Sequence, residues 1–367
     1  MRLFKKIWNK ILCFYYGKKG FSHYFVTFWR KEMLKSYKNS NISKKEKKWA
    51  FRKGFLPYRI KQYGLTNENY KNIISDRDYF YLYPINCRYS SWIDDKLTTK
   101  YVLAPFDEFL PKYYYHIMES DKIFKLKDCN GDYGISVKDV AKFIADNGLV
   151  AAKQAAGTYG IGFYRIQYQN GKYCVNTNDY EYNEFLEFLQ TLDNYIITEY
   201  VEQHPDIKKL NPYSVNTIRV VAINENGNNP IIPFAFMRIG TKKSGFVDNV
   251  AQGGMVAKID VDTGRFHSAE TLANHVYYEG KYHPDTNEKI EGYIPNWNVV
   301  LKGIKDICNY CPQLKWLGFD IAITEDGFSI IEINSHQGLH KAHEYPKEVA
   351  DFLHKELKLK KAKFKQK

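Results

Sequence analysis

The chain has 367 residues, of which 44% are hydrophobic, enough for two or three packed layers or domains. Aromatic residues are abundant, with 31 Tyr, 23 Phe and 6 Trp, and this excludes a disordered chain. The net charge of +13 is concentrated at the ends: residues 1–62 hold 18 Lys or Arg against two Glu, residues 354–367 hold seven Lys against one Glu, and the body between them is acidic. An acidic body with basic ends argues against an ordinary DNA-binding protein, and we expect no nucleic-acid partner.

Residues 1–16 have the pattern of an amphipathic helix. Phe4, Ile7, Trp8, Ile11, Leu12 and Tyr15 recur at helical spacing, while Lys5, Lys6 and Lys10 interleave with them. Such a helix can lie in a membrane interface, with its tryptophan and lysines at the headgroups. Docking on the protein's own body is the alternative, and the sequence leaves both open. The basic, aromatic pattern continues as predicted helix over 21–62, and we assign residues 1–90 to one mainly helical N-terminal region.

The rest of the chain alternates between predicted strands and helices. An aromatic run at 79–84 predicts a strand. Helices are expected from Ser136 to Gly148, at 182–192 and at 298–310, and a frayed basic helix end at 355–367. Strands are expected at 149–153, 163–168, 172–175, 195–201, 217–223, 231–239, 256–261, 316–324 and 328–334. This pattern predicts an α+β fold with mixed sheets rather than regular βαβ repeats.

The six cysteines are scattered along the chain. No disulfide framework is expected at this length, so a reducing cytoplasm fits. Cys308 and Cys311 form one CxxC pair, for which buried structural thiols are favoured over redox or zinc chemistry. No apolar run approaches the roughly 20 residues of a transmembrane helix.

A glycine-rich loop follows the strand that ends in Lys153. Its glycines are Gly157, Gly160 and Gly162, and they allow backbone N–H groups to approach a phosphate closely. The loop leads into a strand, whereas Rossmann and Walker A loops open helices. We therefore interpret it as a lid over phosphates, with a simple glycine-rich hairpin turn as the alternative.

Acidic and amide side chains interrupt the apolar strands of the last predicted hairpin. Glu332 and Asn334 are two residues apart and therefore face the same side of one strand. Asp320 lies on the partner strand, and a turn near Asp326 would bring it alongside. Two carboxylates and an amide oxygen are hard ligands that suit Mg²⁺ shared with nucleotide phosphates. The alternative is an exposed polar strand face.

Two further strands carry charged residues of interest. Ile196-Ile-Thr leads into Glu199, Val201 and Glu202, where the backbone could pair with a purine base and a carboxylate could accept from ribose hydroxyls. Solvated acids at a strand end are the alternative. Arg219 stands alone among Ile and Val, and its guanidinium matches either a phosphate group or an internal salt-bridge partner.

In chain order, these segments resemble the ATP-grasp superfamily over roughly residues 90–345. The closer likeness is to the sugar-transfer-associated ATP-grasp group and its relative in teichuronopeptide synthesis. The matching pieces are Asp95-Lys96 with Leu110-Pro111, the lid after Lys153, Asn216-Thr-Ile-Arg219, Asp248-Asn249 with Gly253-Gly254, and Glu332-Ile-Asn334. One departure is Ser335-His-Gln-Gly338, where many relatives have a Pro-Gly pair.

The resemblance implies two α+β subdomains that clasp ATP, one at 91–200 with the lid and one at 201–354 with the metal site, followed by a basic tail at 355–367. It implies that two lysines hold the phosphates: Lys153 and, before the lid, Lys96, with Lys122 as the rival. Arg219 would steady an acyl-phosphate.

The activity implied is that of an ATP- and Mg²⁺-dependent carboxylate–amine ligase in cell-surface polysaccharide biosynthesis. We expect a cytoplasmic protein that contacts the inner face of the membrane if its basic N-terminus binds lipid. Two alternatives stay open: a phosphotransferase acting on a sugar hydroxyl, and a non-catalytic nucleotide-binding module of a polysaccharide assembly complex.

Overall fold

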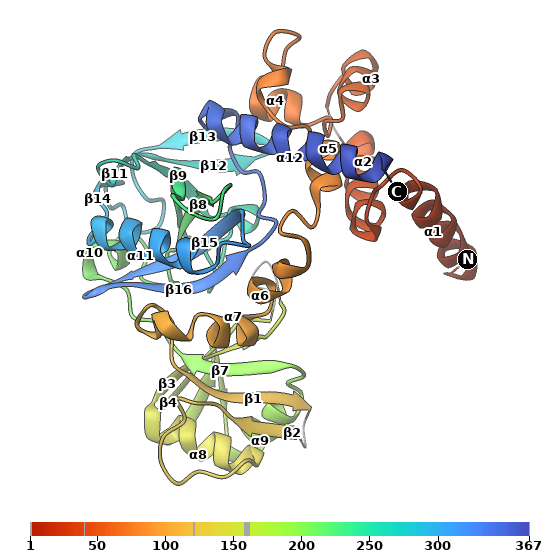
Figure 1. Cartoon of the computed structure of the whole chain (residues 1–367). Coiled ribbons are helices and arrows are strands. Elements are labelled where there is room, and N and C mark those ends of the chain that lie inside the picture. The colour runs from red at the N-terminus through yellow and green to blue at the C-terminus, as the bar shows by residue number, and fades with distance from the viewer. Residues whose placement is uncertain (1, 40, 120–121, 158–161, 367) are drawn as a thin grey trace.

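The computed structural model describes residues 2–39, 41–119, 122–157 and 162–366, and it contains two β-sheets with a helical N-terminal region (Figure 1). The first sheet has seven strands in the order β2-β1-β7-β3-β4-β5-β6. Its strands are β1 (Tyr113–Glu119), β2 (Lys122–Lys125), β3 (Leu149–Gln154), β4 (Tyr164–Gln169), β5 (Lys172–Val175), β6 (Asn178–Tyr180) and β7 (Tyr195–Glu199). The helices α8 (Val137–Asn147) and α9 (Tyr182–Gln190) pack on one face through a shared apolar cluster.

The second sheet has nine strands, seven of them in the order β13-β12-β10-β9-β8-β15-β16; β11 pairs with β10, and β14 pairs with β11. Its strands are β8 (Ile218–Ile223), β9 (Ile231–Ile239), β10 (Met255–Ile259), β11 (Arg265–His267), β12 (Ala269–Ala273), β13 (Val276–Gly280), β14 (Glu291–Tyr293), β15 (Trp316–Thr324) and β16 (Gly327–Asn334). The helix α11 (Trp297–Tyr310) covers one face, where alternate residues of the strands form the largest apolar cluster. The short helix α10 (Pro205–Lys208) follows β7.

The opposite face of the second sheet is covered at one end by N-terminal helices and by α12. Val221, Phe234 and Trp316 of the sheet share an apolar cluster with Tyr79 and Phe352 of these helices. The covering helices are α3 (Lys44–Lys53), α4 (Arg59–Tyr63), α5 (Asp76–Leu82) and α12 (Lys347–Lys365). The helices α1 (Arg2–Gly17) and α2 (Arg30–Asn39) and a π-helical turn at Phe25–Trp29 pack together in a separate small cluster with Leu56. The N-terminal region is thus part of the packed body.

Two short helices connect this region to the first sheet. They are α6 (Ser91–Asp94) and α7 (Lys96–Val102), and α7 lies between the two sheets in Figure 1. Asp95 caps α7, because its carboxylate accepts from the Thr98 N–H at 2.7 Å. Leu97 packs on the first sheet beside Tyr113, and α7 therefore sets where its first residue, Lys96, lies.

Two expectations differ from the structure. Residues 79–84 were predicted as a strand, but Asp76–Leu82 form helix α5, because the Ser75 side chain caps the Asp78 N–H and so starts a helix upstream of the aromatic run. Mixed sheets were expected, yet the strand pairs within the described residues run antiparallel. Helix α12 ends at Lys365, so most of the basic segment 355–367 lies in this helix.

Cys308 and Cys311 are both buried, at 0% and 1% exposure, and the described cysteines are free thiols. Burial raises the pKa of the Cys311 thiol to about 11, which leaves it protonated and unreactive near neutral pH. None of the described helices is long and apolar enough to cross a bilayer.

Candidate functional site

The hairpin of β15 and β16 carries Asp320, Glu332 and Asn334, and a bulge determines which way they face. From the turn, the strands pair as Thr324 with Gly327 and Ile321 with Ile330, but Asp320 pairs with Glu332. One extra residue, Ile331, therefore lies in β16. A bulge of this kind shifts the alternation of side chains by one position.

The membership of the apolar cluster under α11 reflects this shift in alternation. Phe328 and Ile330 of β16 belong to it, and the next member is Ile333 rather than residue 332. Without the bulge, Glu332 would enter this apolar layer. With it, Glu332 and Asn334 face the opposite side together with Asp320, so the local backbone assembles the predicted cluster of oxygen ligands.

Asn334 contacts both carboxylates directly. The Asn334 amide donates to Glu332 Oε1 at 3.0 Å and to Asp320 Oδ2 at 3.4 Å. Asp320 is 2% exposed, and its burial would raise the carboxyl pKa, but Arg219 and Arg238 outweigh this and lower the pKa to about 2. Asp320 is therefore ionised at any working pH.

Two arginines hold Asp320, and the sequence identified only one of them. Arg219 donates from Nε and Nη2 to the two Asp320 oxygens at 2.5 and 2.9 Å, and from Nη1 to Gln337 at 3.3 Å. The internal salt bridge that the sequence left open for Arg219 is thus present, with Asp320 as the partner. Arg238 was missed; its Nη2 lies 2.8 Å from Asp320 Oδ2, and its side chain keeps 19% exposure against 7% for Arg219.

Arg238 is held from its other side by Asp248, which lies 3.6 Å away. Asp248 in turn accepts from the Thr217 N–H at 2.7 Å, and burial raises the pKa of its carboxyl group. A signal for Arg238 was present in the sequence, since it is the one charged residue in the strand 231–239. Such a residue in a buried strand needs a partner.

Lys96 connects the two sheets. Its backbone N–H donates to Ala155 O at 2.9 Å, its ammonium donates to Gly157 O at 2.9 Å, and the same ammonium lies 3.4 Å from Glu332 Oε2. Its rival, Lys122, is exposed on the edge strand β2 and forms an ion pair with Glu119 at 2.7 Å. The structure therefore brings Lys96, and not Lys122, beside the hairpin.

Lys153 lies at the end of β3, on the face of the first sheet opposite α8 and α9. Its neighbours Val150 and Ala152 face those helices, and alternation turns Lys153 toward α7. Burial, with a further contribution from the charge of Lys96, lowers the pKa of Lys153 to about 7, although Glu332 acts in the opposite direction. Two ammonium groups and one carboxylate converge here. A bound polyanion would offset the repulsion between the two ammonium groups.

The lid glycines are partly described. Gly157 gives its carbonyl to Lys96, and Gly162 has φ of +74° with the Tyr195 hydroxyl where a Cβ would lie. Any larger residue at 162 would be strained and would collide with Tyr195. Gly160 lies outside the described residues.

The predicted base-binding segment crosses from one sheet to the other. Glu199 ends β7, and its carboxylate accepts from the Lys112 N–H at 3.1 Å. Val201 is buried, whereas the Glu202 side chain is 84% exposed and lies 3.3 Å from Lys208. The His204 N–H then donates to Ile323 O of β15 at 2.8 Å, so the segment borders both sheets.

The segment that departs from the expected Pro-Gly pair supports the hairpin. Ser335 donates from its hydroxyl to Asp94 at 2.8 Å, and Gln337 bonds Arg219. Gln337 fills the space where a Cβ at position 318 would lie, which explains the glycine there.

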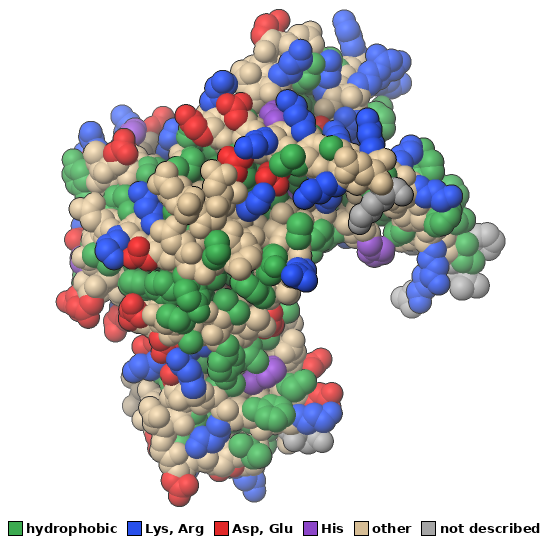
Figure 2. Space-filling model, viewed as in Figure 1, with side chains coloured by type: hydrophobic (Ala, Val, Ile, Leu, Met, Phe, Trp, Pro, Cys, Tyr) green, Lys and Arg blue, Asp and Glu red, His purple; other side chains and the backbone are tan. Residues whose placement is uncertain are grey.

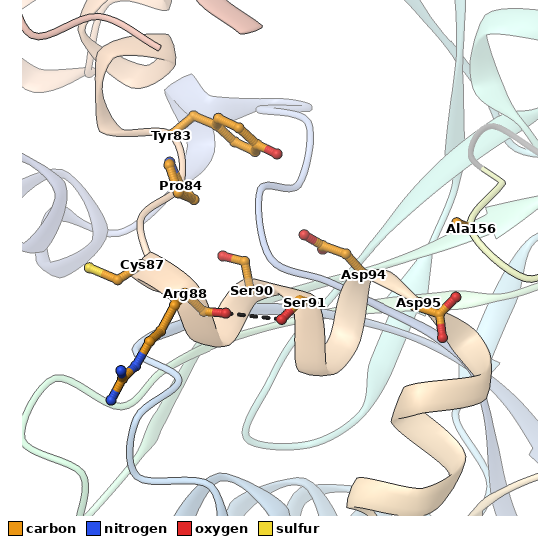
Figure 3. A pocket seen from close by; sticks show the side chains of 9 residues that line it. All are labelled: Tyr83, Pro84, Cys87, Arg88, Ser90, Ser91, Asp94, Asp95 and Ala156. Atoms are coloured by element: carbon orange, nitrogen blue, oxygen red, sulfur yellow. Dashed lines mark hydrogen bonds between the residues drawn. The ribbon is translucent and has the colours of Figure 1, made fainter. Parts of the chain in front are cut away.

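A groove of about 350 Å³ adjoins this arrangement (Figure 3). It extends from Tyr83 along α6 to Asp94 and Asp95, and Ala156 of the lid borders it. Burial raises the pKa of Asp94. One end of the groove thus contacts the residue that caps α7 and therefore lies beside Lys96.

The donor set of the hairpin fits a magnesium ion, because it combines two carboxylates with an amide. A half-turn of the Asn334 amide would present its oxygen, and the two ends of an amide are assigned only from their hydrogen bonds. Within the described residues, no group of three or more His, Cys, Asp or Glu side chains is arranged to hold a metal ion. Any site here therefore needs Asn334 or oxygens from a ligand.

Two sheets joined across lysines, a glycine-rich lid and a carboxylate hairpin define the ATP-grasp class of proteins. The chain belongs to the sugar-transfer associated ATP-grasp family, whose model matches residues 76–344. No curated protein sequence matches the chain. The predicted superfamily and fold class are thereby confirmed.

Solved structures of similar proteins are distant. One is the D-alanine–D-alanine ligase of Bacillus anthracis, with 12% identity, a match over 74% of this chain and 69% of that chain, and a TM-score of 0.37. Another is the D-alanine–D-alanine ligase of Coxiella burnetii, with 12% identity, a match over 81% of this chain and 67% of that chain, and a TM-score of 0.38. A third is N5-carboxyaminoimidazole ribonucleotide synthetase from Thermotoga maritima, with 11% identity, a match over 67% of this chain and 42% of that chain, and a TM-score of 0.34. This chain spans less than half the length of the synthetase.

Proposed function

We propose that the protein is an ATP- and Mg²⁺-dependent ligase that activates a carboxylate as an acyl-phosphate and joins it to an amine. The observation that carries the proposal is the bulge at Ile331, which turns Glu332 and Asn334 toward Asp320 and Lys96. A bulge that removes a carboxylate from an apolar layer and adds it to a charged cluster is a costly local feature. Such features concentrate next to active sites.

Lys96 and Lys153 would bind the phosphates of ATP. Lys153 has a pKa lowered by burial and by Lys96, so a phosphate supplies the negative charge that this pair lacks. Asp320, Glu332 and Asn334 would hold Mg²⁺, which when bound offsets phosphate charge and orients the nucleotide. Glu199, Val201 and Glu202 would border the base and ribose, and the lid glycines Gly157, Gly160 and Gly162 would exclude water from the acyl-phosphate.

Arg238 is the better candidate to contact the acyl-phosphate directly. Its guanidinium is partly open, whereas Asp320 and Gln337 engage that of Arg219. Arg219 would then act as a positioning residue that orients Asp320. Both arginines contribute positive charge where negative charge develops during transfer.

The groove along α6 is the candidate entry for a second substrate. It ends next to Lys96, and Asp94 and Asp95 line it (Figure 3). Two carboxyl groups near the phosphate-binding lysines suit an incoming amine, because they attract an ammonium group and can accept its proton. A role in cell-surface polysaccharide biosynthesis, at the cytoplasmic side, is proposed from the association of the family with sugar transfer.

Two other functions would use the same residues. A phosphotransferase would pass the γ-phosphate to a sugar hydroxyl, and a nucleotide-binding module would hold ATP without turnover. Either nucleophile could give its proton to the carboxyl groups beside the groove, but only an ammonium group is also attracted by their charge, and this favours the ligase. The three hairpin ligands argue against a purely binding role, because a module without turnover has no need of all three.

The deciding experiment identifies the products. Purified protein is incubated with Mg²⁺, ATP and pools of candidate carboxylates and amines, and the products are analysed by mass spectrometry. A ligase gives an amide with ADP and free phosphate, and hydroxylamine traps its acyl-phosphate as a hydroxamate. A phosphate ester would establish the phosphotransferase, and nucleotide binding without ADP formation in any pool would support the binding module.

A further inference from the structure

The N-terminal helix α1 uses one side to attach to the protein and exposes an apolar stripe on the other. Leu12, Cys13 and Tyr16 pack against the cluster formed by Phe25 and its neighbours. The outward apolar side chains are 49–66% exposed: Ile7, Trp8, Ile11, Phe14 and Tyr15. At about 100° per residue, the centres of the two sets lie roughly 145° apart on the helix, and Trp8 borders Leu12 one turn away.

This arrangement changes the choice that the sequence leaves open. Among the side chains of α1 that the structure describes, from Lys6 onward, docking on the protein's own body accounts for three apolar residues. Five large apolar side chains on one helix remain in contact with water. A single exposed hydrophobic residue needs no explanation, but a contiguous group of them marks an interaction site. The exposed stripe therefore needs an occupant from outside the described chain.

The surroundings of the stripe are cationic. Lys6 and Lys10 are exposed on α1, the Lys18 ammonium lies 4.5 Å from the centre of the Phe14 ring, and that of Lys19 lies 4.1 Å from the Tyr15 ring. The first acidic residue of the chain is Glu32. Basic and hydrophobic side chains alternate over the projecting end of the molecule in Figure 2.

The end of α12 adds to the same surface. The ring of Phe364 lies against Gly20, so the last turns of α12 are beside the base of α1, and both chain ends lie on this side in Figure 1. Lys363 and Lys365 are exposed there, and no acidic residue follows Glu356. The two basic ends of the sequence thus form one surface in space.

We propose that α1 and the end of α12 form a docking surface for an anionic lipid bilayer. The exposed stripe would enter the boundary between headgroups and acyl chains, with Trp8 and Tyr15 at the level where amphipathic rings are stabilised. The lysines of both helices would contact anionic headgroups. A second copy of the chain fits less well, because it would bring the same lysines face to face. This inference does not depend on the proposed ligase activity.

The test is flotation of the full chain with vesicles of phosphatidylcholine alone or with phosphatidylglycerol added. We expect binding to the anionic vesicles to be at least about tenfold stronger and to weaken in high salt, because headgroup attraction is screened. Equal binding to both vesicles, or none to either, overturns the proposal. Preferential binding of single-stranded RNA, with no vesicle binding, overturns it in favour of a nucleic-acid surface.

Matched variants locate the contact. The triple variant Trp8→Ser, Ile11→Ser, Phe14→Ser should lose at least about tenfold in vesicle affinity. A control that removes three exposed apolar side chains elsewhere, Tyr278→Ser, Tyr293→Ser and Val299→Ser, should stay within about twofold. Equal effects of the two variants, or wild-type behaviour of the first, contradict the inference. If the first variant melts early, the single change Phe14→Ser, at a side chain 66% exposed, repeats the test.

The charge contribution is tested separately. Replacing Lys6, Lys10 and Lys18 by Gln should weaken binding to anionic vesicles by up to about 100-fold, given roughly fivefold for each lysine near such a surface. The control replaces Lys44, Lys45 and Lys48, which are equally exposed on α3. An equal loss in the control would show non-specific attraction by net charge. Sedimentation analysis that reveals a dimer through α1, with no vesicle binding, would assign the stripe to a second copy.

Discussion

The second sheet carries two opposite environments on the same face. At one end, Val221, Ile223, Phe234, Phe236 and Trp316 are covered by the N-terminal helices and α12. At the other end the face is charged, with Arg219, Arg238, Asp320, Glu332 and Asn334 in mutual contact. Strands β8, β9 and β15 contribute to both ends.

The difference lies in what completes each half. The apolar half is completed by the chain's own helices, so its contribution to stability comes from burial. In the charged half, the chain compensates its own charges only in part. Asp320 pairs with two arginines, whereas Lys96 and Lys153 have a single carboxylate, Glu332, near them. Substitutions in the first half should therefore affect folding. Those in the second half should affect ligand binding, and they should also destabilise the fold where they leave a buried charge unpaired, as at Asp320.

Trp316→Ala should give the largest effect on stability. The side chain is fully buried, stacks on Phe352 at 6.0 Å and donates to the Tyr79 hydroxyl at 3.0 Å. Its loss should lower the free energy of unfolding by about 3–5 kcal/mol in urea titrations, and leave the ATP affinity of the folded fraction intact. Tyr293→Ala, at a side chain 65% exposed, should stay within about 0.5 kcal/mol. A large loss of ATP affinity in Trp316→Ala would mean that the two halves are coupled.

Arg219→Met should come next, at about 3 kcal/mol of lost stability, because it removes a partner of a buried carboxylate. Adding Asp320→Asn should restore much of the stability without restoring ATP turnover. The matched control is Arg265→Met, at an exposed position on β11. If Arg219→Met is as stable as wild type and yet inactive, Arg219 acts on the substrate directly, as the resemblance implied.

Glu332→Gln should separate function from stability in the charged half. ATP turnover should fall by about 100-fold or more, equivalent to roughly 2.7 kcal/mol, since a charged ligand for the metal is lost. Stability without nucleotide should change by less than about 1 kcal/mol, because the Lys96–Glu332 pair remains partly open to water. The thermal stabilisation given by Mg²⁺-ATP to the wild type should largely vanish. Glu325→Gln, at the exposed turn of the same hairpin, is the control, and full turnover in Glu332→Gln would make that carboxylate structural.

The sequence predicted the hairpin but not the reason it works. The turn at Glu325 and Asp326 was recognisable from its residue types, and the register it sets was close to correct. The bulge at Ile331 was not, because a run of Ile residues gives no local signal for one extra residue. Period-two alternation alone would have put Glu332 beside Phe328 in the apolar layer.

Tertiary contacts decided what else the sequence missed. Strands β11 to β14 are short and mostly half-exposed, so they lack a clear alternation of polar and apolar residues. Arg238 and Asp248 meet only because β9 lies beside β8 and a loop returns to Thr217. The choice between Lys96 and Lys122 likewise depended on which lysine the folded chain brings to Glu332, and composition cannot supply that.

The smallest expected effect is on ATP affinity and comes from Lys153. Its pH dependence should show that protonation of this lysine is the cause. Phosphates bind the ammonium form, whereas the pKa of about 7 in the free protein means that most copies lack this proton at pH 8. ATP binding at pH 8 should therefore take up a proton, and ATP affinity should fall by up to about tenfold per pH unit above 7 and level off below about pH 6. The folded-state pKa is depressed, so the free protein should also gain stability from this residue as pH rises from about 7 toward 10.

Calorimetry at pH 8 in two buffers of different ionisation enthalpy measures the proton uptake. Lys153→Gln should weaken ATP binding by about 1.5–3 kcal/mol at pH 6.5 and abolish the uptake, whereas Lys142→Gln, at an exposed position on α8, should behave as wild type. In the free protein, Glu332→Gln should lower the pKa of Lys153 further, since Glu332 is the carboxylate that raises it. Proton uptake that persists in Lys153→Gln would mean that another group titrates, and the lysine would then not be the residue that meets the phosphates.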